Sequence, residues 1–448
     1  MALTGLQIYK LLPQTNCKEC GLPTCLAFAM KLAAKQAELA ACPYVSESSK
    51  QQLEAAAQPP VRLITLSADG RKVSVGNEIV LFRHEKTFYN RPGIFVRIKD
   101  TDAPDKLAAK AKELEAFVVD YVGIKLQLDG IALENASGDA AKFAAAAEAV
   151  YGVAKMPLIL IAKDAAAFEA ALAKVSGAVP LLYAADASNW QAVAAVAKKA
   201  KAPLAIKGDG NLQNLSNLSE QVKGAGVEDI VLDPGARDFL GTLTLATQIR
   251  RLAIKKNFRP LGYPLIAFPG EGVSSPDEEP VLAAQHIGKY AGFVVLDHFT
   301  PARAYALLVL RQNIYTDPQK PIQVKPGLYE INNPKPESPV LVTTNFSITY
   351  FSISNEVEGA GIPAWLLVAD AEGMSVLTAW AAGKFDADRI AKGVKTTNVE
   401  SKISRKRLVL PGAVAVLMGE VEEVLPGWQV EVGPREAVDA PAYLKLKP

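Results

Sequence analysis

The feature that most constrains the fold of this 448-residue chain is a repeated alternation between residues 61 and 316. Short apolar runs rich in branched side chains are each followed by a stretch rich in Ala, Lys and Glu. Parallel strands are buried on both faces and need helical crossovers, so this alternation is typical of a parallel α/β sheet. The eight runs are FVRI (95–98), GIKLQL (123–128), LILIA (158–162), LLYAA (181–185), LAIKG (204–208), IVLDPG (230–235), LIAFPG (265–270) and FVVLDH (293–298).

Eight strand-then-helix units in succession predict a (β/α)8 TIM barrel over residues 61–316, and an open doubly wound sheet is the alternative. The stretch DKLAAKAKELEAFVVDY after the first run predicts a helix over 105–121. Two earlier segments, VRLITLS and VSVGNEIVLF, predict a hairpin that caps the N-terminal end of the barrel.

Smaller regions flank the predicted barrel. Residues 1–60 form a helical module, with a helix at 3–12, a second at 25–41, and a polar linker at 46–60 that ends in two prolines. On the other side, residues 317–339 contain six prolines and are predicted to be a semi-rigid linker.

The last region, residues 340–448, is predicted to be a small Rossmann-like α/β domain. Its strands are expected at VLVTT (340–344), WLLVA (365–369), RLVLPG (407–412) and WQVEVG (428–433), with helices between them. The whole chain is therefore of the α/β class, with a small helical module in front.

All four cysteines fall within 26 residues, at Cys17, Cys20, Cys25 and Cys42. Structural zinc sites usually pair two C-x2-C knuckles. Here three cysteines lie close together and the fourth is remote and precedes Pro43, which favours a cubane iron–sulfur cluster. Zinc and a set of free buried thiols remain the alternatives.

Charge and hydropathy exclude several classes of function. The 49 basic and 47 acidic residues nearly cancel, so the chain has no strong field to attract nucleic acid or an anionic membrane. No apolar run approaches the roughly 18 residues of a membrane span, and the first residues lack the order of a secretion signal. The sequence therefore predicts a cytoplasmic protein with neither a nucleic-acid nor a membrane partner.

Particular stretches resemble a known family. TNCKECGLPTCLAFAMKLA with ACPY, and later TTNFSITYF and DAEGMSVLTAWAAGKF, are similar to the large subunits of corrinoid iron–sulfur proteins. The order of cluster module, barrel and small Rossmann-like domain is similar as well, and the resemblance covers essentially the whole chain.

The resemblance implies a methyl-group carrier of the anaerobic acetyl-CoA (Wood–Ljungdahl) pathway. It implies a [4Fe-4S] cluster on the four cysteines, and a cobalamin-type corrinoid bound by the C-terminal domain at the interface with a separate small subunit. Cobalt would accept a methyl group from methyltetrahydrofolate through a methyltransferase partner and pass it to CO dehydrogenase/acetyl-CoA synthase. The cluster would reduce inactive Co(II) to Co(I), and the isolated chain would have no catalytic residue of its own.

The distribution of histidine bears on how a corrinoid would be held. None of the three histidines lies in the last 150 residues, and there is no Asp-x-His-x-x-Gly motif. A corrinoid in this domain is therefore expected to have no histidine ligand from the domain. The resemblance implies such a base-off, weakly ligated cobalt, and loss of an axial donor favours reduction of cobalt.

Corrinoid contacts are expected where the strands of the last domain end, because doubly wound sheets bind ligands there. The same residue types also favour ordinary turns and helix caps. The candidates are Thr343, Thr344, Asn345, Phe346, Glu372, Gly373, Met374, Ser375, Val376, Leu377, Gly412, Ala413, Gly433, Pro434 and Arg435.

The predicted strand ends of the barrel carry polar residues too. We interpret them as helix caps and rim ion pairs rather than as a catalytic site, with a docking surface for partner proteins as the next alternative. Two other functions stay open: a self-contained corrinoid methyltransferase whose barrel binds the pterin, and an iron–sulfur electron-transfer protein. The polar residues are Lys99, Asp100, Gln127, Asp129, Lys163, Asp164, Asp186, Lys207, Asp209, Asp233, Glu271, Asp297 and His298.

Overall fold

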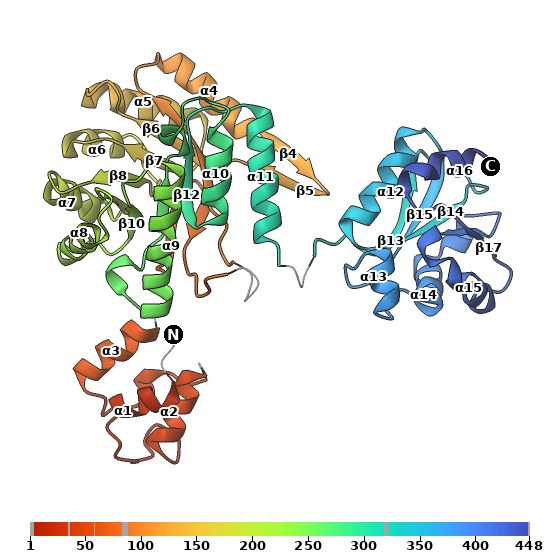
Figure 1. Cartoon of the computed structure of the whole chain (residues 1–448), viewed down its shortest axis with the longest axis horizontal. Helices are drawn as coiled ribbons and strands as arrows, with labels where there is room; N and C mark the ends of the chain where they lie inside the picture. The colour runs from red at the N-terminus through yellow and green to blue at the C-terminus, as the bar shows by residue number, and fades with distance from the viewer. Residues whose placement is uncertain (1–3, 35, 58, 83–87, 318–320, 447–448) are drawn as a thin grey trace. The chain divides into compact units, whose positions relative to one another are not determined.

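The computed structural model describes residues 4–34, 36–57, 59–82, 88–317 and 321–446. The chain divides into two compact units, Met1–Val119 with Leu126–Tyr315 and Asp120–Lys125 with Thr316–Pro448 (Figure 1). Each unit is described by itself below.

The N-terminal module is helical, with α1 (Gly5–Leu11), α2 (Cys25–Ala33), the 3-10 turn η1 (Leu39–Ala41) and α3 (Glu47–Ala57). The predicted helix at 25–41 is too long, because α2 ends at Ala33. The predicted linker at 46–60 is wrong over most of its length, since α3 occupies it. Its sequence ESSKQQLEAAA consists largely of good helix formers, and Leu53 is buried in the apolar cluster of the module.

The predicted barrel is present. Eight parallel strands close on themselves in sequence order, and their residues are nearly all buried, as strands covered on both faces must be. The strands are β3 (Gly93–Lys99), β6 (Gly130–Glu134), β7 (Leu158–Ile161), β8 (Leu181–Ala185), β9 (Leu204–Lys207), β10 (Ile230–Asp233), β11 (Leu265–Ala267) and β12 (Ala291–Leu296).

The second predicted strand, at 123–128, is wrong. That segment belongs to a separate two-stranded sheet of β4 (Val118–Tyr121) and β5 (Ile124–Gln127), and β6 takes its place in the barrel. The run IKLQ alternates apolar and polar residues, which suits a strand with one wet face, whereas Gly130–Leu133 are all buried. Gly130 is needed there because a Cβ would lie 2.1 Å from Phe95 Cε1 and 2.2 Å from the Pro157 carbonyl oxygen.

The predicted hairpin is formed by β1 (Ile64–Ala68) and β2 (Arg71–Val75). Its apolar side chains join the cluster inside the barrel at the end where the strands begin, since Val73 and Val75 contact Gly93 and Gly292. The barrel helices are α4 (Pro104–Ala116), α5 (Ala140–Val153), α6 (Ala165–Leu172), α7 (Trp190–Ala200), α8 (Leu212–Gly224), α9 (Phe239–Lys256), α10 (Glu279–Gly288) and α11 (Pro301–Tyr315). The short helices η2 (Arg259–Leu261) and η3 (Pro269–Gly272) flank β11.

The C-terminal unit contains a five-stranded sheet of order β13-β15-β14-β16-β17. All the strands predicted for this domain are present. The extra strand β13 lies inside the predicted linker at 317–339, so that linker is shorter than the prolines suggested. The strands are β13 (Gly327–Ile331), β14 (Val340–Thr344), β15 (Ala364–Ala369), β16 (Arg407–Leu410) and β17 (Gln429–Val432), and only β13 is antiparallel to its neighbour.

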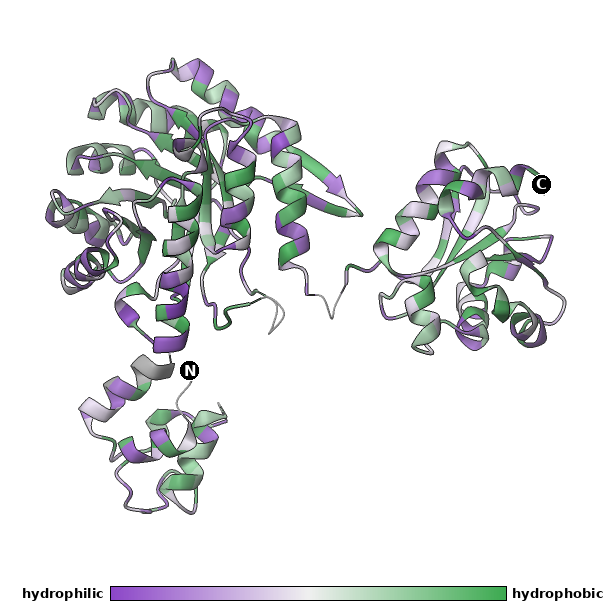
Figure 2. Ribbon diagram, viewed as in Figure 1, coloured by the Kyte–Doolittle hydropathy of each residue, from purple (hydrophilic) through white to green (hydrophobic). Residues whose placement is uncertain are grey.

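Helices cover both faces of this sheet. One apolar cluster packs α13, α14 and α15 against the sheet, and a second cluster on the other face packs α12 and α16. Hydrophobic residues accordingly gather on the strands, and hydrophilic residues gather on the outer sides of the helices (Figure 2). The elements are α12 (Ser347–Gly359), α13 (Val376–Ala381), α14 (Ala387–Thr397), η4 (Val399–Ser401), η5 (Gly412–Leu417), α15 (Met418–Val424), η6 (Ala437–Asp439) and α16 (Ala440–Leu446).

Candidate functional sites

The four cysteines come from one small part of the N-terminal module. Cys17 and Cys20 lie in the loop between α1 and α2, Cys25 is the first residue of α2, and Cys42 follows η1. Cys25 is buried, and Cys20 and Cys42 pack beside it in the same apolar cluster, while Cys17 is exposed. Within the described residues, no three histidine, cysteine or acidic side chains are already gathered tightly enough to hold a metal ion. The donor set is nevertheless complete, because four thiols are what a cubane cluster requires.

The loop that carries Cys17 turns repeatedly. Asn16, Lys18 and Gly21 have φ angles of 50°, 68° and 78°. Asn16 also joins the loop to α2, because its Oδ1 accepts a hydrogen bond of 2.8 Å from the Cys25 amide and its own amide lies 3.4 Å from Cys25 Sγ. Left-handed turns of this kind direct backbone N–H groups into a concave surface that suits an anion, and iron–sulfur sites use such surfaces. The loop therefore fits a cluster bound by thiolates.

A side-chain contact joins this loop to the segment after Cys42. The Tyr44 hydroxyl donates a 2.7 Å hydrogen bond to Glu19 Oε1. The accepting carboxylate raises the pKa of Tyr44, and the nearby Cys17 and Cys42 add to the effect. The contact thus ties the remote fourth cysteine to the loop with the other three.

The C-terminal domain has a switch in strand order at β14. The chain passes from β14 to β15 on one side and later returns to β16 on the other. Strand β14 pairs with β15 as far as Thr344–Ala369, but it pairs with β16 only at Val340–Leu408 and Leu341–Val409. The two strands on either side of the switch therefore separate before they end, and this is the place where doubly wound sheets bind ligands.

Two hydroxyls at this edge lack partners. Thr344 Oγ1 and Ser347 Oγ are buried, with their residues 0% and 1% exposed, and neither makes a hydrogen bond to any residue that the structure describes. Leaving a buried hydroxyl unpaired costs about 1–3 kcal/mol, so native proteins rarely do it without a reason. Thr344 was predicted as a contact, and Ser347 was not, although TTNFS contains both. These hydroxyls are the observation in this domain that points to a missing ligand.

Asn345, another predicted contact, is hydrogen-bonded within the chain. Its amide is fully engaged: Oδ1 accepts from the amides of Ala371 and Gly373, at 2.9 and 3.0 Å, and Nδ2 donates to Asp370 Oδ1 at 3.4 Å. Asn345 is 1% exposed. Its side chain therefore holds the loop after β15 against the end of β14.

The other predicted contacts are spread over the same edge. Gly412 is required there, because a Cβ would lie 2.4 Å from the Gly433 carbonyl oxygen, and this joins the loops after β16 and β17. Val376 belongs to the apolar core, and Met374 and Ala413 pack against it. Glu372 forms an ion pair of 2.7 Å with Lys384. The residues left with at least part of their surface in solvent are Phe346, Ser375, Leu377, Gly433, Pro434 and Arg435, and Thr343 and Gly373 are buried.

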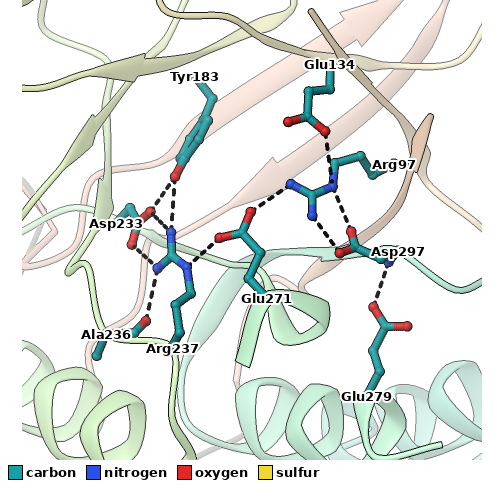
Figure 3. A network of polar contacts seen from close by, with 9 residues as sticks. All are labelled: Arg97, Glu134, Tyr183, Asp233, Ala236, Arg237, Glu271, Glu279 and Asp297. Carbon is teal, nitrogen blue, oxygen red and sulfur yellow. Dashed lines mark hydrogen bonds and ion pairs between the residues drawn. The ribbon is translucent and has the colours of Figure 1, made fainter. Parts of the chain in front are cut away.

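The mouth of the barrel is filled by a charged network centred on Arg97 (Figure 3). Arg97, in the middle of β3, donates to Asp297 Oδ1 at 2.7 Å and to Glu271 Oε1 at 2.7 Å, and Glu134 Oε2 lies 3.6 Å away. The Arg97 side chain is only 10% exposed. Burial opposes its charge, but the hydrogen bond and charge of Asp297 outweigh burial and raise the pKa of Arg97.

A second arginine continues the network. Glu271 accepts from Arg97 and also from Arg237 Nε, at 2.6 Å, and it therefore bridges the two guanidinium groups. Arg237 makes paired hydrogen bonds of 2.9 and 2.8 Å to the buried Asp233, which also accepts a 2.5 Å hydrogen bond from the Tyr183 hydroxyl. Sequence reasoning missed Arg97, Arg237 and Tyr183. Both guanidinium groups are occupied by the chain's own carboxylates, which supports the interpretation as rim ion pairs.

Several of the remaining polar strand ends also have structural partners. Asp186 accepts from Ser188, Asp209 from Asn214, and His298 Nδ1 lies 3.1 Å from Glu279 Oε2. The predicted position of Gln127 and Asp129 at this rim is wrong, because the segment 123–128 is not a strand of the barrel. Asp129 precedes β6 at the opposite end, where it accepts from the Ile94 amide at 2.8 Å and pairs with Arg311.

His286 on α10 lies behind the network and gives the first testable prediction. Burial, aided by the charge of Arg237, lowers its pKa to about 4. The unfolded chain therefore binds a proton at a higher pH than the folded chain, so stability is lost as the pH falls from 7 towards 4. We expect the free energy of unfolding to fall by about 2 kcal/mol between pH 7 and pH 5 because His286 takes up a proton more readily in the unfolded chain. Urea unfolding of His286→Phe should show a correspondingly weaker acid dependence, and an unchanged dependence would contradict the assignment.

None of the helices in the described parts of the chain is both long and apolar enough to cross a membrane.

Comparison with known proteins gives matches along the whole chain. The family model for the CO dehydrogenase/acetyl-CoA synthase delta subunit matches residues 63–444, and a model described as "Putative Fe-S cluster" matches residues 12–44. The corrinoid/iron-sulfur protein large subunit of Moorella thermoacetica is 45% identical over 445 residues, which are 99% of this chain and 99% of that protein. The acetyl-CoA decarbonylase/synthase complex subunit gamma of Methanothermobacter thermautotrophicus is 36% identical over 454 residues, with the same coverage of 99% for both.

Among solved structures, 7,8-dihydropteroate synthase from Vibrio fischeri matches 57% of this chain and 100% of its own, with 14% identity and a TM-score of 0.38. A likeness at this level carries no argument about function.

Proposed function

The chain belongs to the family of the CO dehydrogenase/acetyl-CoA synthase delta subunit and the corrinoid/iron-sulfur protein large subunit, and from this premise we propose that it is a methyl-group carrier of the anaerobic acetyl-CoA pathway. In this proposal the C-terminal domain binds a cobalamin-type corrinoid and the N-terminal module binds a [4Fe-4S] cluster. The isolated chain is a carrier and not an enzyme.

The observation that carries the proposal is the pair of unpaired hydroxyls at the strand-order switch. Thr344 Oγ1 and Ser347 Oγ lie where β14 separates from β16, and nothing in the described residues satisfies them. A corrinoid bears amide side chains on its rim, which can pair with hydroxyl groups. Gly412 and Gly433 let the neighbouring loops approach closely, and a flat macrocycle needs such a surface.

The chain's own residues define how the corrinoid would be held. This domain has no histidine, because the last one in the chain is His298. We therefore propose a base-off corrinoid that hydroxyl and backbone groups would hold, without a histidine ligand from this domain. When bound, the corrinoid supplies a cobalt that accepts and releases a methyl group, and the cluster supplies the electron that restores the reduced metal.

The proposed ligands of the cluster are Cys17, Cys20, Cys25 and Cys42. The Asn16 amide, 3.4 Å from Cys25 Sγ, already shows the N–H···S contact that stabilises thiolate ligands. Free thiols persist in a reducing compartment, so the proposed location is the cytoplasm.

The proposed partners are the small subunit, a methyltetrahydrofolate methyltransferase, and CO dehydrogenase/acetyl-CoA synthase. Large apolar side chains are exposed on the elements beside the switch, with Ile348 at 50%, Leu377 at 55% and Val416 at 63%. Exposed apolar groups near a ligand edge support a protein interface there, and we assign it to the small subunit. The barrel gives less support to a pterin site of its own, since Arg97 and Arg237 are occupied.

Corrinoid binding tests the proposal. In the variant that combines Thr344→Val and Ser347→Ala, we expect the ligand-free chain to be as stable as the wild type or more stable, because two unpaired hydroxyls are removed. We expect its affinity for corrinoid to fall about tenfold or more, since each lost hydrogen bond contributes about 1 kcal/mol. Retained cobalt in anaerobically copurified complexes and denaturant unfolding are the two measurements.

Ser354→Ala is the matched control. Ser354 is also buried on α12, but its hydroxyl donates to the Phe351 carbonyl oxygen at 3.5 Å. It should leave corrinoid binding unchanged. Undiminished binding by the double variant would count against Thr344 and Ser347 as corrinoid contacts.

A further inference from the structure

Residues 321–326, which precede β13, run along the proposed ligand edge of the C-terminal sheet, where β14 and β15 end. Strand β13 is antiparallel to β15, and its first residue, Gly327, lies opposite Val368 near the end of β15. Just before β13, Gln323 forms a bridge with Phe346, which follows β14. The residues at 321–326 therefore cross from the edge strand over the end of β15 to the end of β14.

Backbone and side-chain contacts hold this segment in place. The Val324 amide donates to the Asn345 carbonyl oxygen at 2.9 Å, and the Ser347 amide donates to the Ile322 carbonyl oxygen at 3.1 Å. Gln323 Oε1 accepts from Asn345 Nδ2 at 3.2 Å. The Gln323 side chain also lies directly on Gly373, where a Cβ would be 2.6 Å from its Cγ and Nε2.

The same segment flanks the unpaired hydroxyls. Its two backbone hydrogen bonds are made to Asn345 and Ser347. Thr344 and Ser347 themselves are 0% and 1% exposed. A ligand can therefore pair with these hydroxyls only after something that covers them has moved. The seated arrangement also keeps two hydroxyls unpaired, which costs free energy that a ligand would return.

We propose that residues 322–324 form a strap that is seated on the ligand edge of the C-terminal sheet when the site is empty and leaves it when a ligand reaches Thr344 and Ser347. Binding at the edge thereby releases residues 322–324 from the sheet and lengthens the segment that leads into the C-terminal domain. The identity of the ligand as a corrinoid rests on the proposed function, whereas the seated strap does not. An extended chain spans about 3.3–3.6 Å per residue, so releasing these three residues adds about 10 Å of reach.

Hydrogen–deuterium exchange on the chain copurified with its small subunit tests the strap, in cofactor-free and aquocobalamin-loaded forms. The peptide that contains Val324 should be protected in the cofactor-free form and exchange at least tenfold faster in the loaded form. Greater protection of this peptide after loading would overturn the proposal, because the segment would then be a wall of the bound site.

Gln323→Ala removes the contacts with Asn345 and Gly373 while the backbone of the strap remains. We expect faster exchange at Val324 without any cofactor, and a severalfold gain in corrinoid affinity because the competing seated state is weakened. Lys325→Ala is the control, since Lys325 is exposed in the same segment and its side chain makes none of these contacts. Equal exchange in Gln323→Ala and wild type, or weaker corrinoid binding by Gln323→Ala, would overturn the strap.

Failure of the proposed function has a different signature. Neither the wild type nor any variant would then retain cobalt after gel filtration. Release of the strap by a corrinoid would in that case be excluded. Protection of Val324 in the wild type and its loss in Gln323→Ala would still establish the seated strap.

Discussion

Cys20→Ser is expected to abolish the iron–sulfur cluster of the N-terminal module while the C-terminal domain keeps its corrinoid. A serine hydroxyl is a far poorer iron ligand than a thiolate, and a cubane with one ligand missing loses iron. The wild-type complex should contain about four irons with matching sulfide and one cobalt. The variant should lose most of the iron and the associated visible absorption, and it should keep the cobalt. Cys17, Cys25 and Cys42 are expected to behave in the same way.

Metal and sulfide analysis on anaerobically purified complexes is the measurement. Thr15→Ser is the matched control. Thr15 is exposed in the same loop, and the structure shows no contact between its side chain and a cysteine among the described residues. Zinc in place of iron in the wild type would contradict the cluster, and iron retained by the Cys20 variant would exclude Cys20 as a ligand. Loss of cobalt together with iron would show that the two domains do not hold their cofactors independently.

Arg97→Ala is expected to destabilise the barrel by about 3 kcal/mol, the largest effect that we expect from a substitution outside the cofactor sites. Removing Arg97 leaves Asp297 without its bidentate partner and Glu271 with one guanidinium group instead of two. Glu271 has a lowered pKa in the folded chain, since hydrogen bonds from Arg237 and Arg97 outweigh its burial. The stability that Glu271 gains from these hydrogen bonds is present above the ordinary pKa of a glutamate, and it is lost as the pH falls through the lowered pKa of the folded chain. The deficit of the variant should therefore shrink towards pH 4.

Urea unfolding of the barrel at pH 7 and pH 4 measures this deficit and its expected decrease. Arg71→Ala serves as the control, because Arg71 pairs with Glu115 at 3.0 Å but its side chain is 45% exposed. An exposed ion pair contributes about 0–1 kcal/mol, so this control should remain near the wild type. An Arg97 variant as stable as the control would mean that the network at the mouth contributes little to the fold.

Most of the architecture was predictable because its signals are local. Seven of the eight predicted barrel runs are barrel strands, since a strand buried on both faces must be apolar throughout. The one error, at 123–128, ignored the polar residues Lys125 and Gln127 in that run. The linkers contain structure that their composition did not indicate: α3 lies within the polar stretch 46–60, and the prolines of 317–339 flank an edge strand, where proline is tolerated.

The sequence by itself determined the class of the fold, the donor set of the N-terminal module and the absence of a histidine in the last domain. These depend on periodicity and spacing along the chain. Only the tertiary structure decided that Arg97 pairs with Asp297 from the neighbouring strand β12, that Thr344 and Ser347 make no hydrogen bond within the described residues, and that Gln323 lies on Gly373. Such contacts join residues up to 200 positions apart, and they follow from strand register and barrel closure, which no local pattern encodes.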